Sequence, residues 1–173
     1  MGIEIERKFL VSSNDWRPLV SHSINMAQGY LLDANDRTLR IRREDEAYKL
    51  TLKAPHPNGG LTRFEFEYEI PAIDGRQMLE ELCLREPVSK IRHIVEHDGN
   101  RWEIDEFSGA NAGLLIAEIE LDNADIALSM PSWVGADVSG DPRFTNATLY
   151  RAPFSTWSQT DIRLVTLGKG LNA

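Results

Sequence analysis

The sequence predicts a mainly β protein in which each strand has one apolar face and one charged face. The first observation behind this prediction is a period-two alternation of apolar and charged residues that returns along most of the chain. The second is that the charged positions of a given segment are mostly of one sign. Successive side chains on a strand point to opposite faces, so each alternating segment presents its charges together on one side.

The first alternating segment lies at the N-terminus, where Glu4, Glu6 and Lys8 share one face of the predicted strand and apolar residues take the other. Two carboxylates on one strand face repel each other, and same-sign neighbours across strands add to that cost. A positive charge between them relieves the repulsion. The pair therefore favours a divalent metal ion, with an ordinary solvated face as the alternative.

Further alternating segments follow, and their charged faces differ in sign. Arg40 and Arg42 make one of them basic, whereas Glu103 and Asp105 make another acidic. The predicted strands are residues 39–42, 48–53, 63–70, 90–92, 102–105 and 118–121.

This segregation of charge bears on how the predicted strands are arranged. A face that only provides solubility mixes signs, because mixing lowers self-repulsion. An open sheet with its charged face in water therefore fits the pattern less well than a closed barrel, and it stays the alternative. In a closed barrel the charges would line the interior, which must then hold a charged and hydrated guest.

Length and composition indicate one soluble globular domain. The chain has 173 residues, of which 42% are hydrophobic and 27% are charged. The formal net charge of −8 argues against a nucleic-acid surface, and the basic segments lack interleaved aromatic side chains for base stacking. A basic channel inside an acidic protein would instead select a small polyanion.

Cysteine content and hydropathy indicate the cellular compartment of the protein. Cys83 is the one cysteine and lies among leucines, so we expect a buried apolar role, no intrachain disulfide and a reducing cytoplasm. No stretch approaches ~18 apolar residues, and the chain begins with a charged segment rather than a signal sequence. We therefore expect neither secretion nor a membrane span.

Three helices are predicted, over residues 14–20, 74–84 and 123–130. Asp74 would cap the second helix, and Pro131 would end the third.

We expect residues 1–152 to form a single domain and residues 153–173 to be an appended tail or short helix. His93 and His97 are four residues apart, which would suit a zinc pair on a helix. They lie in a predicted strand, so we expect ordinary surface histidines.

The ordered motifs resemble those of the CYTH, or triphosphate tunnel metalloenzyme, family, which is named for class IV adenylate cyclases and thiamine triphosphatases. Its hallmark is Glu-x-Glu-x-Lys near the N-terminus, which residues 4–8 match in pattern and position. The similarity continues through the alternating segments to residues 141–146 and so covers nearly all of residues 3–147. In detail the chain is most similar to the compact bacterial members that favour inorganic tripolyphosphate.

The resemblance implies an α+β, mainly β fold: a closed antiparallel barrel of about eight strands, the triphosphate tunnel, with a charged lumen and a few outer helices. It also implies Mg²⁺ or Mn²⁺ as the cofactor. In this picture the basic residues hold the phosphate chain and the acidic residues hold the metal.

Roles for individual side chains follow from the same resemblance. The implied phosphate ligands are Lys8, Arg40, Arg42, Lys53, Lys90, Arg92 and Arg143. The implied metal ligands are Glu4, Glu6, Glu118 and Glu120, with Glu65, Glu67 and Asp105 as weaker candidates. Compact members often carry a lysine shortly after the late Asn, where this chain has Ala147 and Thr148.

The implied activity is metal-dependent hydrolysis of a triphosphate, above all of inorganic tripolyphosphate to pyrophosphate and orthophosphate. Glu4 and Glu6 would act through the metal, and a carboxylate or Lys90, its pKa lowered by Arg92, would serve as the base. The alternatives are a class IV-type adenylate cyclase, a thiamine triphosphatase and a non-catalytic polyphosphate-binding module. The expected partner is a small-molecule triphosphate, with no nucleic acid and no membrane, and a homodimer is left open.

Overall fold

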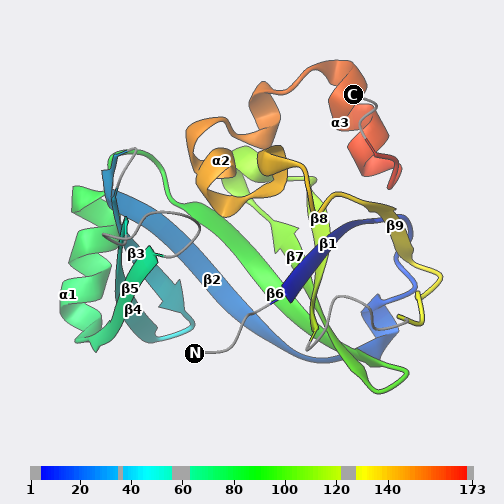
Figure 1. Ribbon diagram of the computed structural model, residues 1–173, viewed down its shortest axis with the longest axis horizontal. Helices are drawn as coiled ribbons and strands as arrows, with labels where there is room; N and C mark the ends of the chain where they lie inside the picture. The colour runs from blue at the N-terminus through cyan, green and yellow to red at the C-terminus, as the bar shows by residue number, and fades with distance from the viewer. Residues whose placement is uncertain (1–4, 35–36, 56–62, 122–127, 171–173) are drawn as a thin grey trace. The chain divides into compact units, whose positions relative to one another are not determined.

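Figure 1 shows the computed structural model, which describes residues 5–34, 37–55, 63–121 and 128–170. Within these ranges the protein is mainly β, and each strand pair of known register is antiparallel. The predicted mainly β class with a few helices is confirmed. The strands are β1 (Ile5–Val11), β2 (Val20–Asp33), β3 (Thr38–Glu44), β4 (Ala47–Pro55), β5 (Arg63–Ile70), β6 (Val88–His97), β7 (Asn100–Phe107), β8 (Leu115–Leu121) and β9 (Val134–Asp137).

Hydrogen bonding orders these strands as β5-β4-β3-β2-β6-β7-β8-β1-β9. The described ranges thus contain nine strands rather than the eight that the resemblance implied. The end strands β5 and β9 are not paired with each other there, so hydrogen bonds do not close the sheet. The closed barrel is therefore not confirmed.

The chain falls into two compact units. The larger unit comprises residues 1–24 and 90–173, and the smaller unit comprises residues 25–89. Helix α1 (Ala72–Gln77) belongs to the smaller unit, and α2 (Asn146–Arg151) and α3 (Gln159–Thr166) belong to the larger unit.

The core of the larger unit is built on the apolar positions of its alternating strands. Phe9, Trp102 and Ile119 are buried there together with Trp16 and Trp133. The ring centres of Trp102 and Trp133 are 5.4 Å apart in an edge-to-face arrangement. Because this core occupies the apolar face of the strands, their charged positions must lie on the other face.

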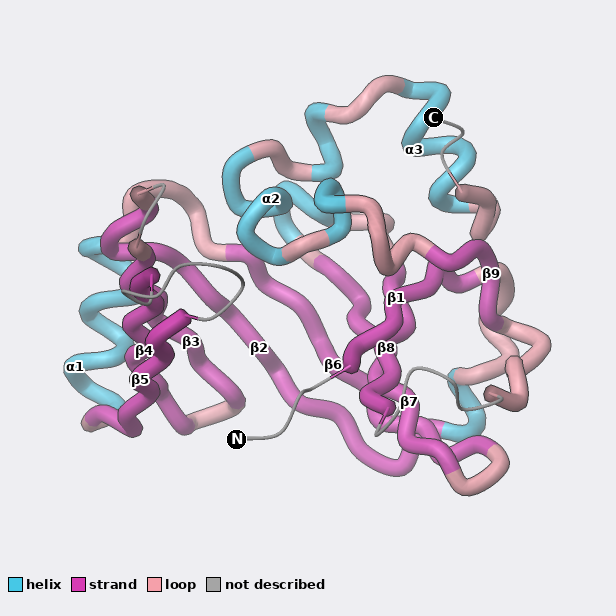
Figure 2. The backbone as a smooth tube through the Cα atoms, in the orientation of Figure 1, coloured by secondary structure: helices cyan, strands magenta, loops and turns pink. Residues whose placement is uncertain are grey.

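Helical segments follow β9 in the larger unit, as Figure 2 shows. The Thr145 hydroxyl caps α2 by accepting from the Thr148 N–H at 3.2 Å, and the Ser158 hydroxyl caps α3 by accepting from the Asp161 N–H at 3.1 Å. Helix α3 lies within residues 153–173, for which the sequence predicted a tail or short helix. Helix α2 was not predicted.

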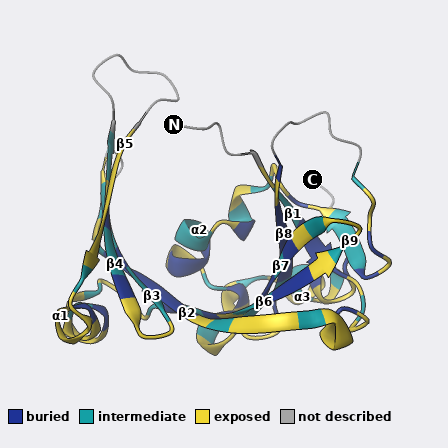
Figure 3. Ribbon diagram, turned by 90° about the horizontal axis from the view of Figure 1, so that it is seen from below, coloured by how far each residue is buried: buried dark blue, intermediate teal, exposed yellow. Residues whose placement is uncertain are grey.

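The smaller unit packs α1 beside β3 and β4 (Figure 1). Ile41, Tyr48 and Leu79 form its buried core with Ala27. Gly75 allows the close approach, because a Cβ at this position would lie 2.4 Å from the Tyr48 Cβ. Residues 64–69 of β5 are exposed, as the yellow stretch of this strand in Figure 3 illustrates.

The predicted helices need correction. Residues 14–20 contain only the short 3-10 turn Arg17–Leu19, and β2 begins directly after it. The second helix starts at Ala72 with Pro71 as its N-cap, not Asp74, and it continues as a π-helical turn over Met78–Leu82. Most of the third predicted helix lies outside the described residues. No helix in the described ranges has the length and apolar character needed to span a membrane.

Candidate functional site

Four neighbouring strands of the larger unit bring charged positions onto one face. Strand β1 pairs with β8, β8 with β7, and β7 with β6. The registers place Lys8 opposite Glu118, Glu118 opposite Glu103, and Arg92 opposite Asp105. We call the set Glu6, Lys8, Lys90, Arg92, Glu103, Asp105 and Glu118 the larger-unit cluster.

Asp105 is the buried centre of this cluster, with 0% of its surface exposed. Arg92 donates to it from Nε to Oδ1 and from Nη2 to Oδ2, both at 2.8 Å, and Lys90 also donates to Oδ2. Burial alone would raise the pKa of Asp105, but the two cations outweigh burial and lower that pKa below its ordinary value. Asp105 is therefore a carboxylate that orients Lys90 and Arg92.

Lys90 is itself buried, and its Nζ lies 5.4 Å from the centre of the Phe107 ring. Burial and the neighbouring charge of Arg92 lower the pKa of Lys90, although Asp105 works in the opposite direction. The sequence-based prediction attributed this lowering to Arg92. In the structure burial is the larger cause.

Glu118 lies between two cations. Lys8 donates to its Oε1, and Arg92 Nη2 donates to its Oε2 at 2.6 Å. Lys8 also pairs with Glu6, its neighbour on the same face of β1. Burial would lower the pKa of Lys8, but Glu118 and Glu6 outweigh burial and raise it. The Lys8 ammonium thus bridges two of the carboxylates predicted to bind a metal.

Acidic residues lie opposite each other at two places in this unit, Glu6 with Glu120 and Glu103 with Glu118. Like charges directly opposite are destabilising, and carboxylate oxygens are the ligands that Mg²⁺ and Mn²⁺ prefer. The chemistry of the donors therefore fits a hard divalent cation. Within the described ranges no three His, Cys, Asp or Glu side chains form a ready metal site, and Glu4 lies outside those ranges.

The smaller unit carries a second charged face on β3, β4 and β5. The registers place Arg40 opposite Thr51 and Thr51 opposite Glu67. Arg40 Nη2 donates to Thr51 Oγ1 at 3.1 Å, and Thr51 donates to Glu67 Oε2 at 2.9 Å. Burial, with the nearby charge of Arg42, lowers the pKa of Arg40. These side chains form one connected row across three strands.

Ion pairs also surround this row. Arg42 Nη1 lies 3.4 Å from Glu44 Oε1, and Lys53 Nζ lies 3.0 Å from Glu65 Oε2. The Nε atoms of Arg40 and Arg42 are buried and have no hydrogen-bond partner among the residues that the structure describes. A phosphate oxygen is the type of acceptor that these two N–H groups lack.

Arg143 lies in the 3-10 turn Pro142–Phe144 of the larger unit. Its Nε donates to Asp141 Oδ1 at 2.9 Å and its Nη2 to Oδ2 at 2.5 Å. Within the described residues these contacts do not join Arg143 to the larger-unit cluster. Its assignment as a phosphate ligand stays a prediction.

The predicted site residues therefore form a group in each unit. The larger unit brings together Glu6, Lys8, Lys90, Arg92, Asp105 and Glu118, with Glu120 exposed on β8. The smaller unit brings together Arg40, Arg42, Lys53, Glu65 and Glu67.

Two residues were missed as members of these groups. Glu103 accepts from Arg92 and lies 3.0 Å from Arg101 Nη2. Its position two residues from Asp105 on β7 was a sufficient signal, since both point to one face. Thr51 could be found only from its place between two lysines on the same face of β4.

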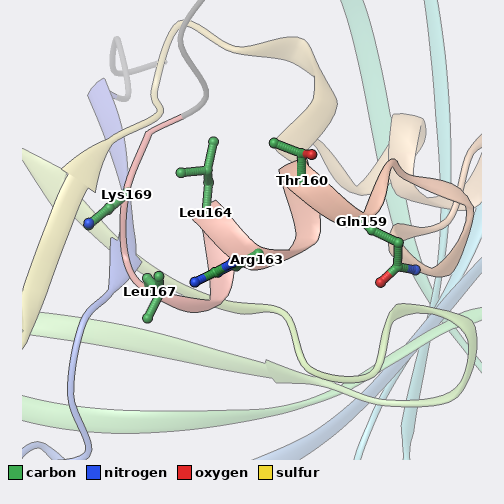
Figure 4. A pocket seen from close by; sticks show the side chains of 6 residues that line it. All are labelled: Gln159, Thr160, Arg163, Leu164, Leu167 and Lys169. Atoms are coloured by element: carbon green, nitrogen blue, oxygen red, sulfur yellow. The ribbon is translucent and has the colours of Figure 1, made fainter.

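A cavity of about 640 Å³ opens at α3 in the larger unit (Figure 4). Two cations but no carboxylate line it, so it lacks the ligands of a hard metal. It also shares no residue with either charged face. The lining residues are Gln159, Thr160, Arg163, Leu164, Leu167 and Lys169.

The family resemblance that the sequence motifs suggested is confirmed by a family model. The model of the CYTH domain matches residues 2–144. The chain belongs to the CYTH family.

Relatives of known name are similar over most of the chain. An inorganic triphosphatase of Acetivibrio thermocellus is 38% identical over 159 residues, which cover 92% of this chain and 100% of the relative. An inorganic triphosphatase of Nitrosomonas europaea is 35% identical, over 84% of this chain and 95% of the relative. The crystal structure of an inorganic triphosphatase superposes with a TM-score of 0.70 at 32% identity, covering 87% of this chain and 95% of that chain.

Proposed function

We propose that this protein is a metal-dependent triphosphatase that hydrolyses inorganic tripolyphosphate to pyrophosphate and orthophosphate. The observation that carries the proposal is the larger-unit cluster, where cations suited to phosphate and carboxylates suited to a metal contact one another directly. Relatives named inorganic triphosphatase, similar over their whole length or nearly so, support the same substrate.

Phosphate binding is assigned to the basic side chains of both units. Lys8, Lys90 and Arg92 would contact phosphate oxygens in the larger unit, and Arg40, Arg42 and Lys53 have the same role in the smaller unit. Arginine gives bidentate contacts to these oxygens and lysine gives a compact point charge. Arg143 is retained as a further ligand.

The metal ligands are assigned to Glu4, Glu6, Glu118 and Glu120. A bound Mg²⁺ or Mn²⁺ would neutralise charge on the phosphate oxygens and supply a water nucleophile. Of the weaker candidates, Asp105 is held by Lys90 and Arg92, and this supports a positioning role rather than metal binding. Glu65 and Glu67 are held by Lys53 and by the Arg40–Thr51 pair, respectively.

The two ion pairs of Lys8 have a consequence for the binding of metal and triphosphate. Its ammonium lies between Glu6 and Glu118. A cation that binds these carboxylates would release Lys8 to a phosphate oxygen. Metal and triphosphate should therefore bind cooperatively, each lowering the cost of binding the other.

Lys90 is proposed as the residue that positions or deprotonates the attacking water. Burial lowers its pKa, which is the direction that a general base requires. Its contact with Asp105 fixes the direction of the ammonium. A carboxylate of the same cluster is the alternative base.

A panel of substrates tests the proposed function. The purified protein is incubated with Mg²⁺ or Mn²⁺ and with tripolyphosphate, ATP or thiamine triphosphate, and the products are separated. We expect orthophosphate and pyrophosphate from tripolyphosphate. Glu118→Gln should reduce this turnover by at least about a hundredfold because it removes a metal ligand, and the matched change Glu106→Gln, at a carboxylate that pairs with Arg17 instead, should leave turnover unchanged.

The outcomes separate the alternatives. Cyclic AMP as the main product from ATP would establish a cyclase, and a clear preference for thiamine triphosphate would change the substrate. Binding without turnover would establish a polyphosphate-binding module. The closed tunnel, one domain over residues 1–152, a cytoplasmic location and a homodimer stay predictions.

A further inference from the structure

Thr51 lies at the centre of the charged face of the smaller unit, and the proposed function leaves it without a role. Its neighbours on the same face of β4 are Lys49 and Lys53, so it is the uncharged position between two cations. It is fully buried. A buried hydroxyl is costly unless it is hydrogen-bonded, so its partners indicate what the position does.

The Thr51 hydroxyl joins a cation to a carboxylate. It donates to Glu67 Oε2 at 2.9 Å and accepts from Arg40 Nη2 at 3.1 Å. The direct contact from Arg40 Nη2 to Glu67 Oε2 is longer, at 3.5 Å. A hydroxyl can donate once and accept as well, so Thr51 satisfies both neighbours at better distances than they achieve directly.

These contacts fix one end of the Arg40 guanidinium. The hydrogen bonds of Arg40 to Thr51 and Glu67 use Nη2, while its buried Nε has no partner within the described part of the chain. The guanidinium is planar, so anchoring Nη2 restricts the direction in which Nε–H points. A phosphate oxygen placed there would restore the missing hydrogen bond.

We propose that Thr51 is a positioning residue for a phosphate-binding arginine: its hydroxyl anchors Nη2 of Arg40, so that Nε is presented to an oxygen of the triphosphate. This inference rests on the proposed function. Thr51 acts through Arg40 and does not itself contact the substrate.

The test replaces the hydroxyl while keeping the shape of the side chain. Thr51→Val should raise the KM for tripolyphosphate about tenfold and change kcat less than about twofold, because it weakens substrate binding and leaves the chemical step unchanged. Calorimetric titration of tripolyphosphate should show a similar rise in Kd. Thr51→Ser keeps the hydroxyl and should stay within about twofold of the wild type.

Two controls separate positioning from packing. Thr38→Val alters a threonine on the same face of β3 that is not bonded to Arg40, and it should leave KM unchanged. In an Arg40→Ala background, Thr51→Val should cause no further loss, because the group that it positions is gone. Thermal unfolding verifies that each variant is folded, and Thr51→Ala replaces Thr51→Val if that variant does not fold.

An unchanged KM in folded Thr51→Val, or a loss that adds to that of Arg40→Ala, would overturn the inference alone. A wild-type protein that neither binds nor hydrolyses tripolyphosphate would overturn the proposed function and the inference with it.

Discussion

Single residues show why the charges of this chain are segregated by strand. The sequence suggested that acid-only and base-only strands surround a charged guest. In the structure, strands of opposite sign are neighbours, as where Arg92 lies opposite Asp105, and these pairs account for part of the segregation without a guest. Carboxylates directly opposite each other, above all Glu6 and Glu120, still favour a bound cation.

Asp105 provides a test of the buried pairing. Asp105→Asn should lower the free energy of unfolding by about 3 kcal/mol at neutral pH, because it leaves the buried Lys90 and the largely buried Arg92 without their carboxylate. Urea unfolding of both proteins measures this difference.

The pH dependence of that difference has a defined sign. Because folding lowers the pKa of Asp105, its contribution is fully present above the unfolded pKa of about 3.9 and is lost as pH falls through the lower pKa of the folded state. The gap between wild type and Asp105→Asn should therefore persist down to about pH 4 and narrow below it. A gap that narrows already between about pH 7 and about pH 5 would contradict the lowered pKa.

At the scale of elements, period-two alternation predicted the strands that have one apolar and one charged face. It missed β2, because residues 26–30 are all buried and interrupt the alternation. It also missed the short strand β9, of four residues, where a period can hardly be detected. The helix prediction over residues 14–20 was wrong because the apolar residues there lead into strand β2, which begins at Val20.

Gly75 tests how α1 is placed in the smaller unit. Gly75→Ala should lower the free energy of unfolding by about 1–3 kcal/mol, because the added Cβ would lie 2.4 Å from the Tyr48 Cβ and push α1 from β4. Urea unfolding provides the measurement. The control is Gly140→Ala, since nothing lies within 4 Å of a Cβ there. Equal stability of wild type and Gly75→Ala would show that α1 does not pack on Tyr48.

For the whole molecule, the sequence predicted which face of each strand is charged better than it predicted which strands are neighbours. The two-residue spacing of Glu6 and Lys8 alone places them on one side of β1, and the family motif suggested their roles. That Lys8 meets Glu118 could not be read from pattern, because the two are 110 residues apart and their pairing depends on the order of strands. Closure of the sheet likewise depends on long-range pairing and is not visible in any local period.

The measurement that tests the central claim most directly is hydrolysis of tripolyphosphate in oxygen-18 water with Mg²⁺ or Mn²⁺. A triphosphatase that delivers water to the terminal phosphorus forms a new bond from the water oxygen to that phosphorus, and pyrophosphate leaves. We therefore predict one labelled oxygen in the released orthophosphate and none in the pyrophosphate. Label in pyrophosphate with unlabelled orthophosphate would contradict attack at the terminal phosphorus, and absence of any turnover would contradict the proposed activity itself.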